Sequence, residues 1–218
     1  MALVFLGPPG AGKGTQAKNL ARSLSLAHVA SGDVFREAIK AKTPLGRRVE
    51  RIVSQGKLVP DRVATQVVLD HLDRLKNPKG FILDGFPRTR AQAAALERHL
   101  TKKKQSVGAA VLFYVRNGVL IRRLSARYQC PVCGEVFNLE TRRPRRAGLC
   151  DNCAGRLARR RDDEPSVVRK RLQVYNDTAR PLLDYYKKSK VFFKVDGEKG
   201  IPGISRQLLT LVRGLRKK

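Results

Sequence analysis

The stretch "ALVFLGPPGAGKGT", residues 2–15, decides the fold. Apolar residues that suit a buried strand lead into a glycine-rich turn, and a segment with helical character starts near residue 13. Glycines in such a turn let backbone N–H groups surround a phosphate, the helix N-terminus adds positive potential, and Lys13 can reach the terminal phosphates. A glycine-rich turn without a ligand is the alternative. The lysine, its spacing and its context all favour a P-loop that binds a nucleoside triphosphate.

The rest of the chain repeats this alternation of strands and helices. Short apolar runs, typical of strands buried on both faces of a parallel sheet, occur at residues 2–7, 80–85, 109–115 and 191–197. Helices are expected at residues 13–25, 61–76, 89–104, 117–127 and 165–188. We therefore predict an α/β fold built on a P-loop doubly wound parallel sheet of about five strands.

Two stretches fit this alternation poorly and are expected to form small appendages on the sheet. One reads as short helices separated by Pro44, Gly46 and Gly56, and the other holds every cysteine. The predicted division is a core of residues 1–29, 60–125 and 164–218, a small helical insertion of residues 30–59 and a cysteine-bearing segment of residues 126–163.

A second phosphate site is expected at "GFILDGFPRT", residues 80–89. Asp84 would end a buried strand, where open α/β sheets bind their ligands, and could hold Mg²⁺ through water. Arg88 would lie at the same edge of the sheet as the P-loop and could grip a phosphate with both arms of its guanidinium. An exposed surface arginine is the alternative for Arg88.

All four cysteines of the chain lie in one motif. Their spacing, C-x₂-C-x₁₆-C-x₂-C, is typical of a structural Zn²⁺ site formed by Cys130, Cys133, Cys150 and Cys153. Two disulfides are disfavoured in a cytosolic chain, and free thiols would leave the regular spacing unexplained. Four thiolates close the coordination of the metal, so a catalytic role for it is excluded.

Composition sets wider limits. The 218 residues favour one domain with appendages, and 42% hydrophobic residues suffice for a core. No run approaches the apolar length of a membrane span, so we expect a cytoplasmic protein. The formal net charge of +28 would attract polyanions, and we expect weak, salt-sensitive association with nucleic acid or an anionic surface.

In combination these residues resemble an adenylate kinase of the long-lid, zinc-binding bacterial type. The motifs that carry the resemblance are "GPPGAGKGTQA", "SGDVFR", "LVPD", "DGFPRT", the two CxxC pairs and "RRDDEPSVVRKRL". The resemblance implies Mg²⁺-dependent, reversible phosphoryl transfer from ATP to AMP giving two ADP, by a monomer without an obligate protein partner. Residues 30–59 would then bind AMP, and residues 126–163 would be a zinc-bearing lid.

The resemblance also assigns individual residues. Those that would hold ATP are Gly10, Ala11, Gly12, Lys13, Gly14, Thr15, Arg127, Val136, Phe137 and the backbone of Lys199. Those that would hold AMP are Ser31, Arg36, Lys57, Leu58, Val59, Gly85, Phe86, Pro87, Arg88, Gln92, Arg160 and Arg171. The catalytic set would be Lys13, Asp84, Arg88, Arg123, Arg160 and Arg171. The family usually has threonine in place of Ser31, and keeping this hydroxyl together with Gln92 favours AMP as the acceptor.

Two other functions compete with this interpretation. The cysteine segment and its arginines could contact nucleic acid while the P-loop drives a helicase-like or RNA-modifying ATPase, but Phe137 is the only aromatic residue between the cysteines. A scaffold that has lost kinase activity and binds ribosomes or DNA by charge is the third possibility. Intact Lys13, Arg88 and Arg160 argue against it.

Overall fold

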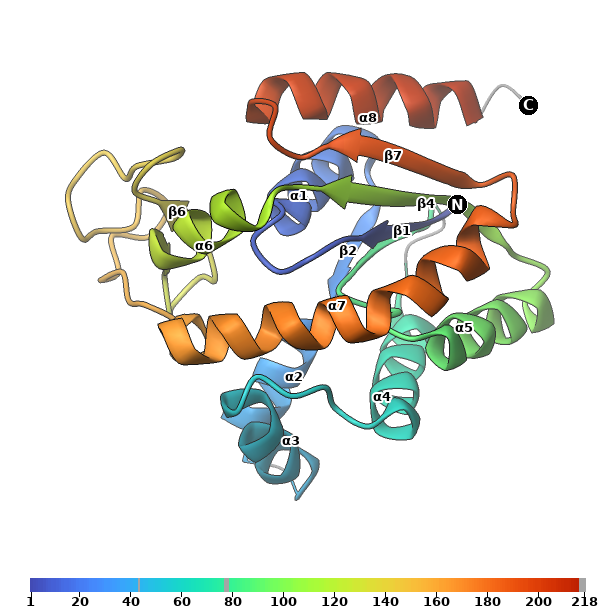
Figure 1. The fold of residues 1–218 in the computed structure, drawn as a ribbon, viewed down its shortest axis with the longest axis horizontal. Helices are drawn as coiled ribbons and strands as arrows, with labels where there is room; N and C mark the ends of the chain where they lie inside the picture. Colours follow the sequence, from blue (N-terminus) through green and yellow to red (C-terminus); the bar gives the residue numbers. More distant parts are fainter. Residues whose placement is uncertain (43, 77–78, 216–218) are drawn as a thin grey trace.

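A parallel sheet forms the centre of the computed structural model, which describes residues 1–42, 44–76 and 79–215. Five strands lie in the order β2-β3-β1-β4-β7 (Figure 1). They are β1 (Ala2–Leu6), β2 (Ala27–Ala30), β3 (Phe81–Asp84), β4 (Val107–Tyr114) and β7 (Phe192–Asp196). Every pairing between neighbours is parallel, so all carboxyl ends meet at one edge. The predicted fold class is confirmed.

Helices cover both faces of this sheet. One face carries α1 (Lys13–Leu24), α6 (Asn117–Ser125) and α8 (Ile201–Leu215), and the other carries α4 (Asp61–Arg74) and α5 (Arg90–Lys102). The long helix α7 (Pro165–Lys187) packs into the first cluster through Leu172 and into the second through Leu182. Within the described ranges, none of the helices combines the length and apolarity that a membrane span requires.

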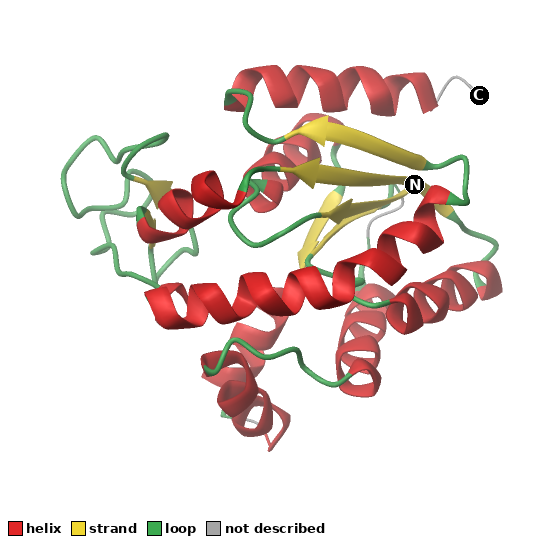
Figure 2. Ribbon diagram, viewed as in Figure 1, coloured by secondary structure: helices red, strands yellow, loops and turns green. Residues whose placement is uncertain are grey.

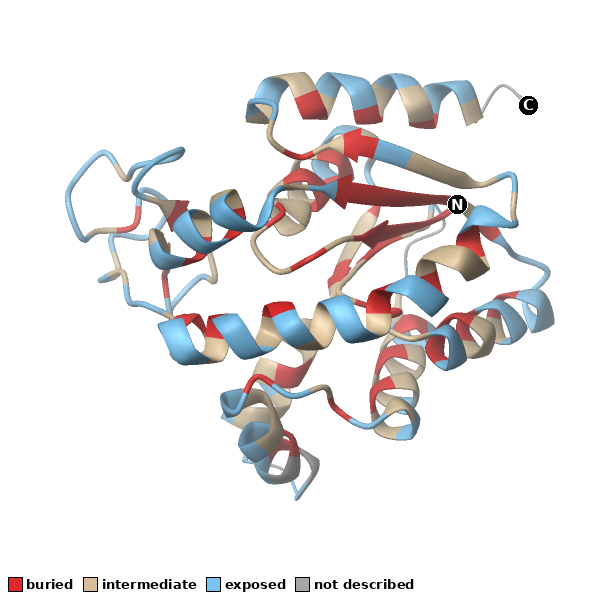
Figure 3. Cartoon of the chain, in the orientation of Figure 1, coloured by how far each residue is buried: buried red, intermediate tan, exposed pale blue. Residues whose placement is uncertain are grey.

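Strand β1 shows why the sheet is buried on both faces. All five of its residues are buried, and red strands fill the centre of Figure 3. Leu3 and Phe5 enter one core cluster, while Val4 and Leu6 enter the other. This alternation follows from the two-residue period of a strand, and it places a continuous apolar run between two helical layers.

Residues 30–59 form a small helical unit below the sheet (Figure 1). Its helices are α2 (Ser31–Lys40) and α3 (Pro44–Ser54), and the apolar cluster of Phe35, Val49 and Val59 continues into α4 through Ala64. A Cβ atom on Gly46 would lie 2.0 Å from the carbonyl oxygen of Ala38. Only glycine therefore permits the two helices to pack this closely.

The cysteine segment is mostly loop, unlike the rest of the chain, which is built of helices and the central strands (Figure 2). Its regular part is an antiparallel pair, β5 (Arg127–Gln129) and β6 (Val136–Asn138). A 3₁₀ turn, Arg161–Asp163, joins it to α7. Its buried cluster consists of Cys130, Phe137 and Cys150, which is too small a core to hold these loops without further cross-links.

Among the core elements, no range was predicted for strand β2, and only the C-terminal end of a helix was indicated where α8 lies. Strand β2 has the sequence "AHVA", and only Val29 is fully buried, because β2 lies at the edge of the sheet. So short and weakly apolar a run lacks a clear strand pattern. Helix α8 follows β7 and buries Ile204, Leu208 and Val212 against the sheet.

Candidate active site

The P-loop connects β1 to α1 at the carboxyl edge of the sheet. Gly10 and Gly12 adopt positive φ angles of 84° and 86°, which glycine accepts without strain. The ammonium group of Lys13 donates to the carbonyl oxygens of Gly7 and Pro8, at 2.7 and 2.8 Å. Withdrawal from water lowers the pKa of Lys13 to about 8, and repulsion from Arg88 adds to the effect. A bound phosphate would supply the missing counter-charge.

Asp84 ends strand β3 directly beside the P-loop helix. A Cβ atom on Gly14 would lie 3.1 Å from its carboxylate, and His28 Nε2 lies 3.8 Å from the same oxygen. Burial alone would raise the pKa of Asp84, yet nearby His28 and Lys13 lower it on balance. The carboxylate is therefore ionised at neutral pH, next to the position where the triphosphate is expected.

Ser31, Gly85 and Arg88 meet at the ends of β2 and β3. The Ser31 hydroxyl and Arg88 Nε both donate to the carbonyl oxygen of Gly85, each at 2.7 Å. Gly85 has a φ of +78°, and a Cβ atom there would lie 2.8 Å from Ser31 Oγ. The site thus requires glycine at this position. Loss of water and repulsion from Arg171 lower the pKa of the Arg88 guanidinium to about 10.

The Gln92 side chain is buried at the start of α5. Its amide donates to Asp61 Oδ1 at 2.8 Å and accepts the backbone N–H of Arg88 at 2.7 Å. Thr89 caps the same helix by accepting the N–H of Gln92. Gln92 therefore holds the Arg88 backbone in place. Its second amide N–H forms no further hydrogen bond with the described residues.

Arginines from the lid and from α7 gather around two carboxylates. Arg127 donates through Nε and Nη2 to the buried carboxylate of Asp163, with Nε at 2.6 Å. Arg171 contacts both Asp162, at 3.0 Å, and Asp163, at 3.1 Å. Desolvation, with repulsion from Arg127, lowers the pKa of the Arg160 guanidinium to about 9. The two acids were not singled out in the sequence, although the "RRRDD" stretch places them beside the arginines.

Arg36 belongs to the same positive cluster. It pairs with Asp33 at 2.5 Å on α2, and its charge lowers the pKa values of both Arg88 and Arg160. The cluster therefore draws on the P-loop, the helical insertion, β3, the lid and α7. So many mutually repelling cations in one cleft indicate a site for polyanions.

The remaining predicted ATP contacts lie around the lid. Arg123 donates to the carbonyl oxygen of Gly197 at 2.8 Å, near the exposed Lys199. Val136 is half-buried on β6. Phe137 is 1% exposed and packs with Cys130 and Cys150, so its side chain stabilises the lid interior and faces no open cleft.

The remaining predicted AMP contacts lie beside α2 and β3. Lys57 is exposed, Leu58 is half-buried, and Val59 packs into the insertion core. Phe86 is buried beneath the sheet edge together with the neighbouring Pro87. Their side chains support the cleft wall, so a ligand would meet mainly the backbone there.

The four cysteines converge within the loops of residues 126–163. Their sulfur atoms all lie within 4.8 Å of one another, and two pairs lie at 3.4 and 3.5 Å. Tetrahedral Zn²⁺ with ligands at about 2.3 Å requires sulfur separations of about 3.8 Å, so the geometry fits this metal. The backbone N–H of Glu135 stabilises the thiolate of Cys133 and lowers its pKa to about 6. Thiolate is the form that binds metal.

A P-loop that shares the carboxyl edge of a parallel sheet with a second, arginine-lined site defines a P-loop phosphotransferase. Residues 5–191 match the family model for adenylate kinase. The adenylate kinase of Thermosipho melanesiensis is 46% identical over 213 residues, which cover 98% of this chain and all of that relative. The adenylate kinase of Fervidobacterium nodosum is 42% identical over 218 residues, covering both chains completely.

That of Thermotoga maritima is 42% identical over 211 residues, or 96% of each chain. This chain therefore belongs to the adenylate kinase family. It is a nucleoside monophosphate kinase that transfers a phosphoryl group reversibly from ATP to AMP and yields two ADP.

Proposed function

We propose that the cleft at the carboxyl edge of the sheet holds ATP and AMP together and aligns them for direct transfer. The observation that carries this proposal is the convergence of Lys13, Arg88 and Arg160, three cations drawn from three different parts of the fold, beside Asp84, Asp162 and Asp163. Two polyphosphates brought end to end repel each other. The cations of the cleft repel one another when no ligand is bound. They offset the repulsion between the two polyphosphates by neutralising the phosphate charge.

ATP would lie along the P-loop. The backbone of Gly10–Thr15 would surround its phosphates, and Lys13 would leave the carbonyl oxygens of Gly7 and Pro8 to reach them. Arg123, Val136 and Lys199 would lie near the base and ribose. Arg127 would contact the triphosphate while Asp163 keeps its guanidinium oriented.

AMP would bind between α2 and the end of β3. Its phosphate would meet Arg36 and Arg88, and its base would lie along the backbone of residues 57–59. Gln92, with one free amide N–H, and Ser31 would provide the polar contacts that favour adenine. Arg160 and Arg171 would contact the phosphoryl group between the two nucleotides.

No residue is needed as a general base, because the attacking oxygen of AMP is already ionised near neutral pH. His71 lies outside the cleft elements, His99 pairs with Asp73, and His28 lies beside Asp84. The chain contributes positive charge, alignment and exclusion of water. Mg²⁺ would be held through water by the ionised Asp84 and would neutralise charge on the ATP phosphates.

Exclusion of water requires closure of the cleft. We propose that residues 30–59 and 126–163 move as bodies against a core of residues 1–29, 60–125 and 164–218. Zn²⁺ on the four cysteines would make the lid rigid, since its buried cluster is small. The lid touches the core through Lys18 on α1, which lies 3.4 Å from the Glu135 carboxylate.

We further infer a monomeric enzyme in the cytoplasm, where the thiolates stay reduced. Its net charge of +28 supports a weak association with polyanions beside catalysis. Because such binding releases counterions, it should weaken steeply with salt.

The proposed specificity is tested by supplying ATP and Mg²⁺ with AMP, GMP, CMP or UMP in turn and measuring diphosphate formation. Rapid turnover with AMP alone supports the assignment of Ser31 and Gln92, and comparable turnover with a pyrimidine monophosphate contradicts it. A zinc chelator should accelerate heat inactivation. Equal inactivation rates with and without chelator would refute a structural Zn²⁺ site.

A further inference from the structure

The lid has a second face, turned away from the nucleotide cleft. Along β5, Arg127 contacts Asp163, and Gln129 accepts a hydrogen bond from Arg160, both on the cleft side. Side chains alternate along a strand, so Tyr128 between them points to the opposite side. Arg159 follows it there, with its guanidinium 5.7 Å from the centre of the Tyr128 ring.

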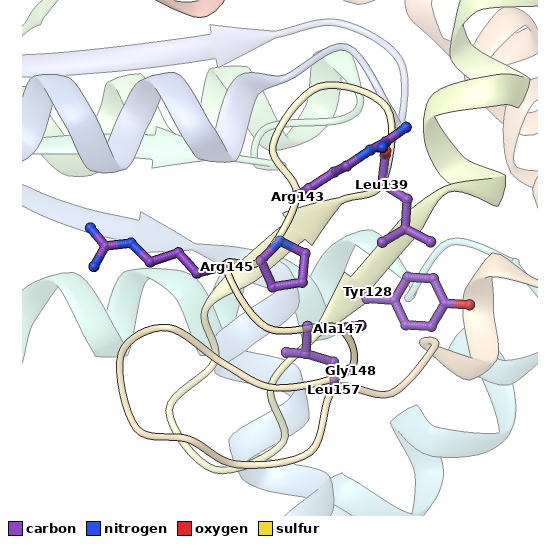
Figure 4. A pocket seen from close by; sticks show the side chains of 8 residues that line it. Tyr128, Leu139, Arg143, Arg145, Ala147, Gly148 and Leu157 are labelled. Atoms are coloured by element: carbon purple, nitrogen blue, oxygen red, sulfur yellow. The ribbon is translucent and has the colours of Figure 1, made fainter.

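A hollow of about 450 Å³ opens on this outer face. It is lined by Tyr128, Leu139, Arg143, Pro144, Arg145, Ala147, Gly148 and Leu157. Figure 4 shows Leu139 and Tyr128 close to one another at one side of the hollow. Leu139 is 41% exposed. The lining therefore combines apolar side chains and one aromatic ring with two arginines, and it contains no acidic side chain.

Two arginines of the lining supply positive charge at the rim. Arg143 Nε donates to the carbonyl oxygen of Leu139, which leaves its terminal amino groups available. The Arg145 guanidinium extends outward in Figure 4 and forms no hydrogen bond or ion pair with the described part of the chain. The carboxylate of Asp151 accepts the backbone N–H of Arg145 at 2.8 Å.

We propose that this outer face of the lid binds single-stranded nucleic acid, with a base in the hollow against Tyr128 and the flanking phosphates on Arg143 and Arg145. The proposal rests on the polyanion association inferred above and gives it a location. An aromatic ring in the wall of a hollow, with arginines at the rim, is an arrangement that can receive an unstacked base and its backbone.

A strand of RNA or DNA fits these observations better than other anions. A lipid headgroup or a sulfated sugar offers no flat ring to fill an apolar hollow, and a duplex keeps its bases stacked inside. The net charge of +28 favours a polymer over a single nucleotide, because each further phosphate adds attraction. The hollow faces away from Asp163, so the bound strand leaves the catalytic cleft accessible.

The test uses the zinc-loaded full-length chain and a fluorescent oligouridine of about 12 nucleotides, within the usual site size of such surfaces. Binding is followed by anisotropy between about 50 and 200 mM salt. Saturating ADP fills the nucleotide cleft, so that only binding elsewhere is seen. Displacement of the oligonucleotide by ADP would overturn the proposal, because the strand would then occupy the cleft.

Two double variants locate the binding. R143S/R145S should weaken binding and reduce the slope of log K against log salt by about 2, one for each lost phosphate contact. R206S/R213S removes the same charge from exposed positions on α8 and should leave the slope unchanged. Equal losses in both variants would overturn the outer-lid site while leaving general association intact. A wild-type chain that binds no polyanion at low salt would refute both.

Tyr128 variants test the base contact. Tyr128→Leu should weaken oligouridine binding about fivefold or more through lost stacking, and Tyr128→Phe should restore it. Heparin, which has no bases, should bind both variants alike. If Tyr128→Leu weakened the binding of heparin and of oligouridine equally, the stacking of a base on Tyr128 would be refuted. The proposal would also be refuted if the wild-type chain bound vesicles of anionic lipid but not oligouridine. ADP formation, zinc content and thermal unfolding verify that each variant is folded.

Discussion

Asp163→Asn removes the carboxylate that holds the lid arginines. Asp163 is 4% exposed and accepts two hydrogen bonds from Arg127 and one from Arg171. The amide keeps the shape, but its NH₂ group faces guanidinium donors. Loss of one partner from a buried ion pair costs about 3–5 kcal/mol. Because Asp162 still lies 3.0 Å from Arg171, we expect the lower end, about 3 kcal/mol.

For a chain of this size, about 3 kcal/mol lowers the melting temperature by about 6–12 °C. Calorimetry of the zinc-loaded enzyme measures this shift, and steady-state kinetics should show a fall in kcat/KM for ATP as Arg127 loses its orientation. Asp177→Asn, at an exposed position on α7, is the matched control and should change neither. A shift below about 2 °C for Asp163→Asn would refute the view that this carboxylate organises the cluster.

Three further expectations follow from the cleft and the lid. Lys13 loses its proton above a pKa of about 8, so kcat/KM for ATP should fall as the pH rises past that value. The value of kcat should persist to higher pH, because bound phosphate keeps Lys13 protonated. Parallel pH profiles of kcat and kcat/KM would contradict this expectation. Gly85→Ala places a Cβ atom 2.8 Å from Ser31 Oγ. This variant should raise KM for AMP about tenfold or more, with little change in KM for ATP. An equal rise in both KM values would instead show a general folding defect. Lys18→Ala breaks a partly exposed ion pair with Glu135. In a urea titration, the free energy of unfolding should change by less than about 1 kcal/mol. A larger loss of stability would mean that this contact holds the lid to the core.

Contiguous motifs were predictable because their geometry is local. The P-loop depends on residues that follow one another, so the order of strand, glycines and lysine was sufficient to identify it. The buried strands β1 and β4 also carry their own signal, since both faces must be apolar. The edge strand β2, with one fully buried residue, has no such requirement and therefore no such pattern.

Tertiary partners could not be predicted in the same way. The sequence does not indicate that Asp163 is buried between Arg127 and Arg171, because Asp163 lies 36 positions after Arg127 in the chain. The burial of the Phe137 side chain with Cys130 and Cys150 could not be predicted either, and its expected contact with ATP stays a prediction. Tyr128 precedes the first cysteine by two positions and gave no signal, since the face of a short strand is decided by its pairing.

Direct transfer between two bound nucleotides is the central claim, and the fate of the phosphoryl group tests it most directly. The enzyme is given ATP with a radioactive γ-phosphoryl group, Mg²⁺ and unlabelled AMP, and the products are separated at early times. We expect the label in ADP, with almost none in inorganic phosphate, because the closed cleft aligns AMP and excludes water. Label that accumulates in inorganic phosphate without regard to AMP would contradict the account and indicate an ATPase.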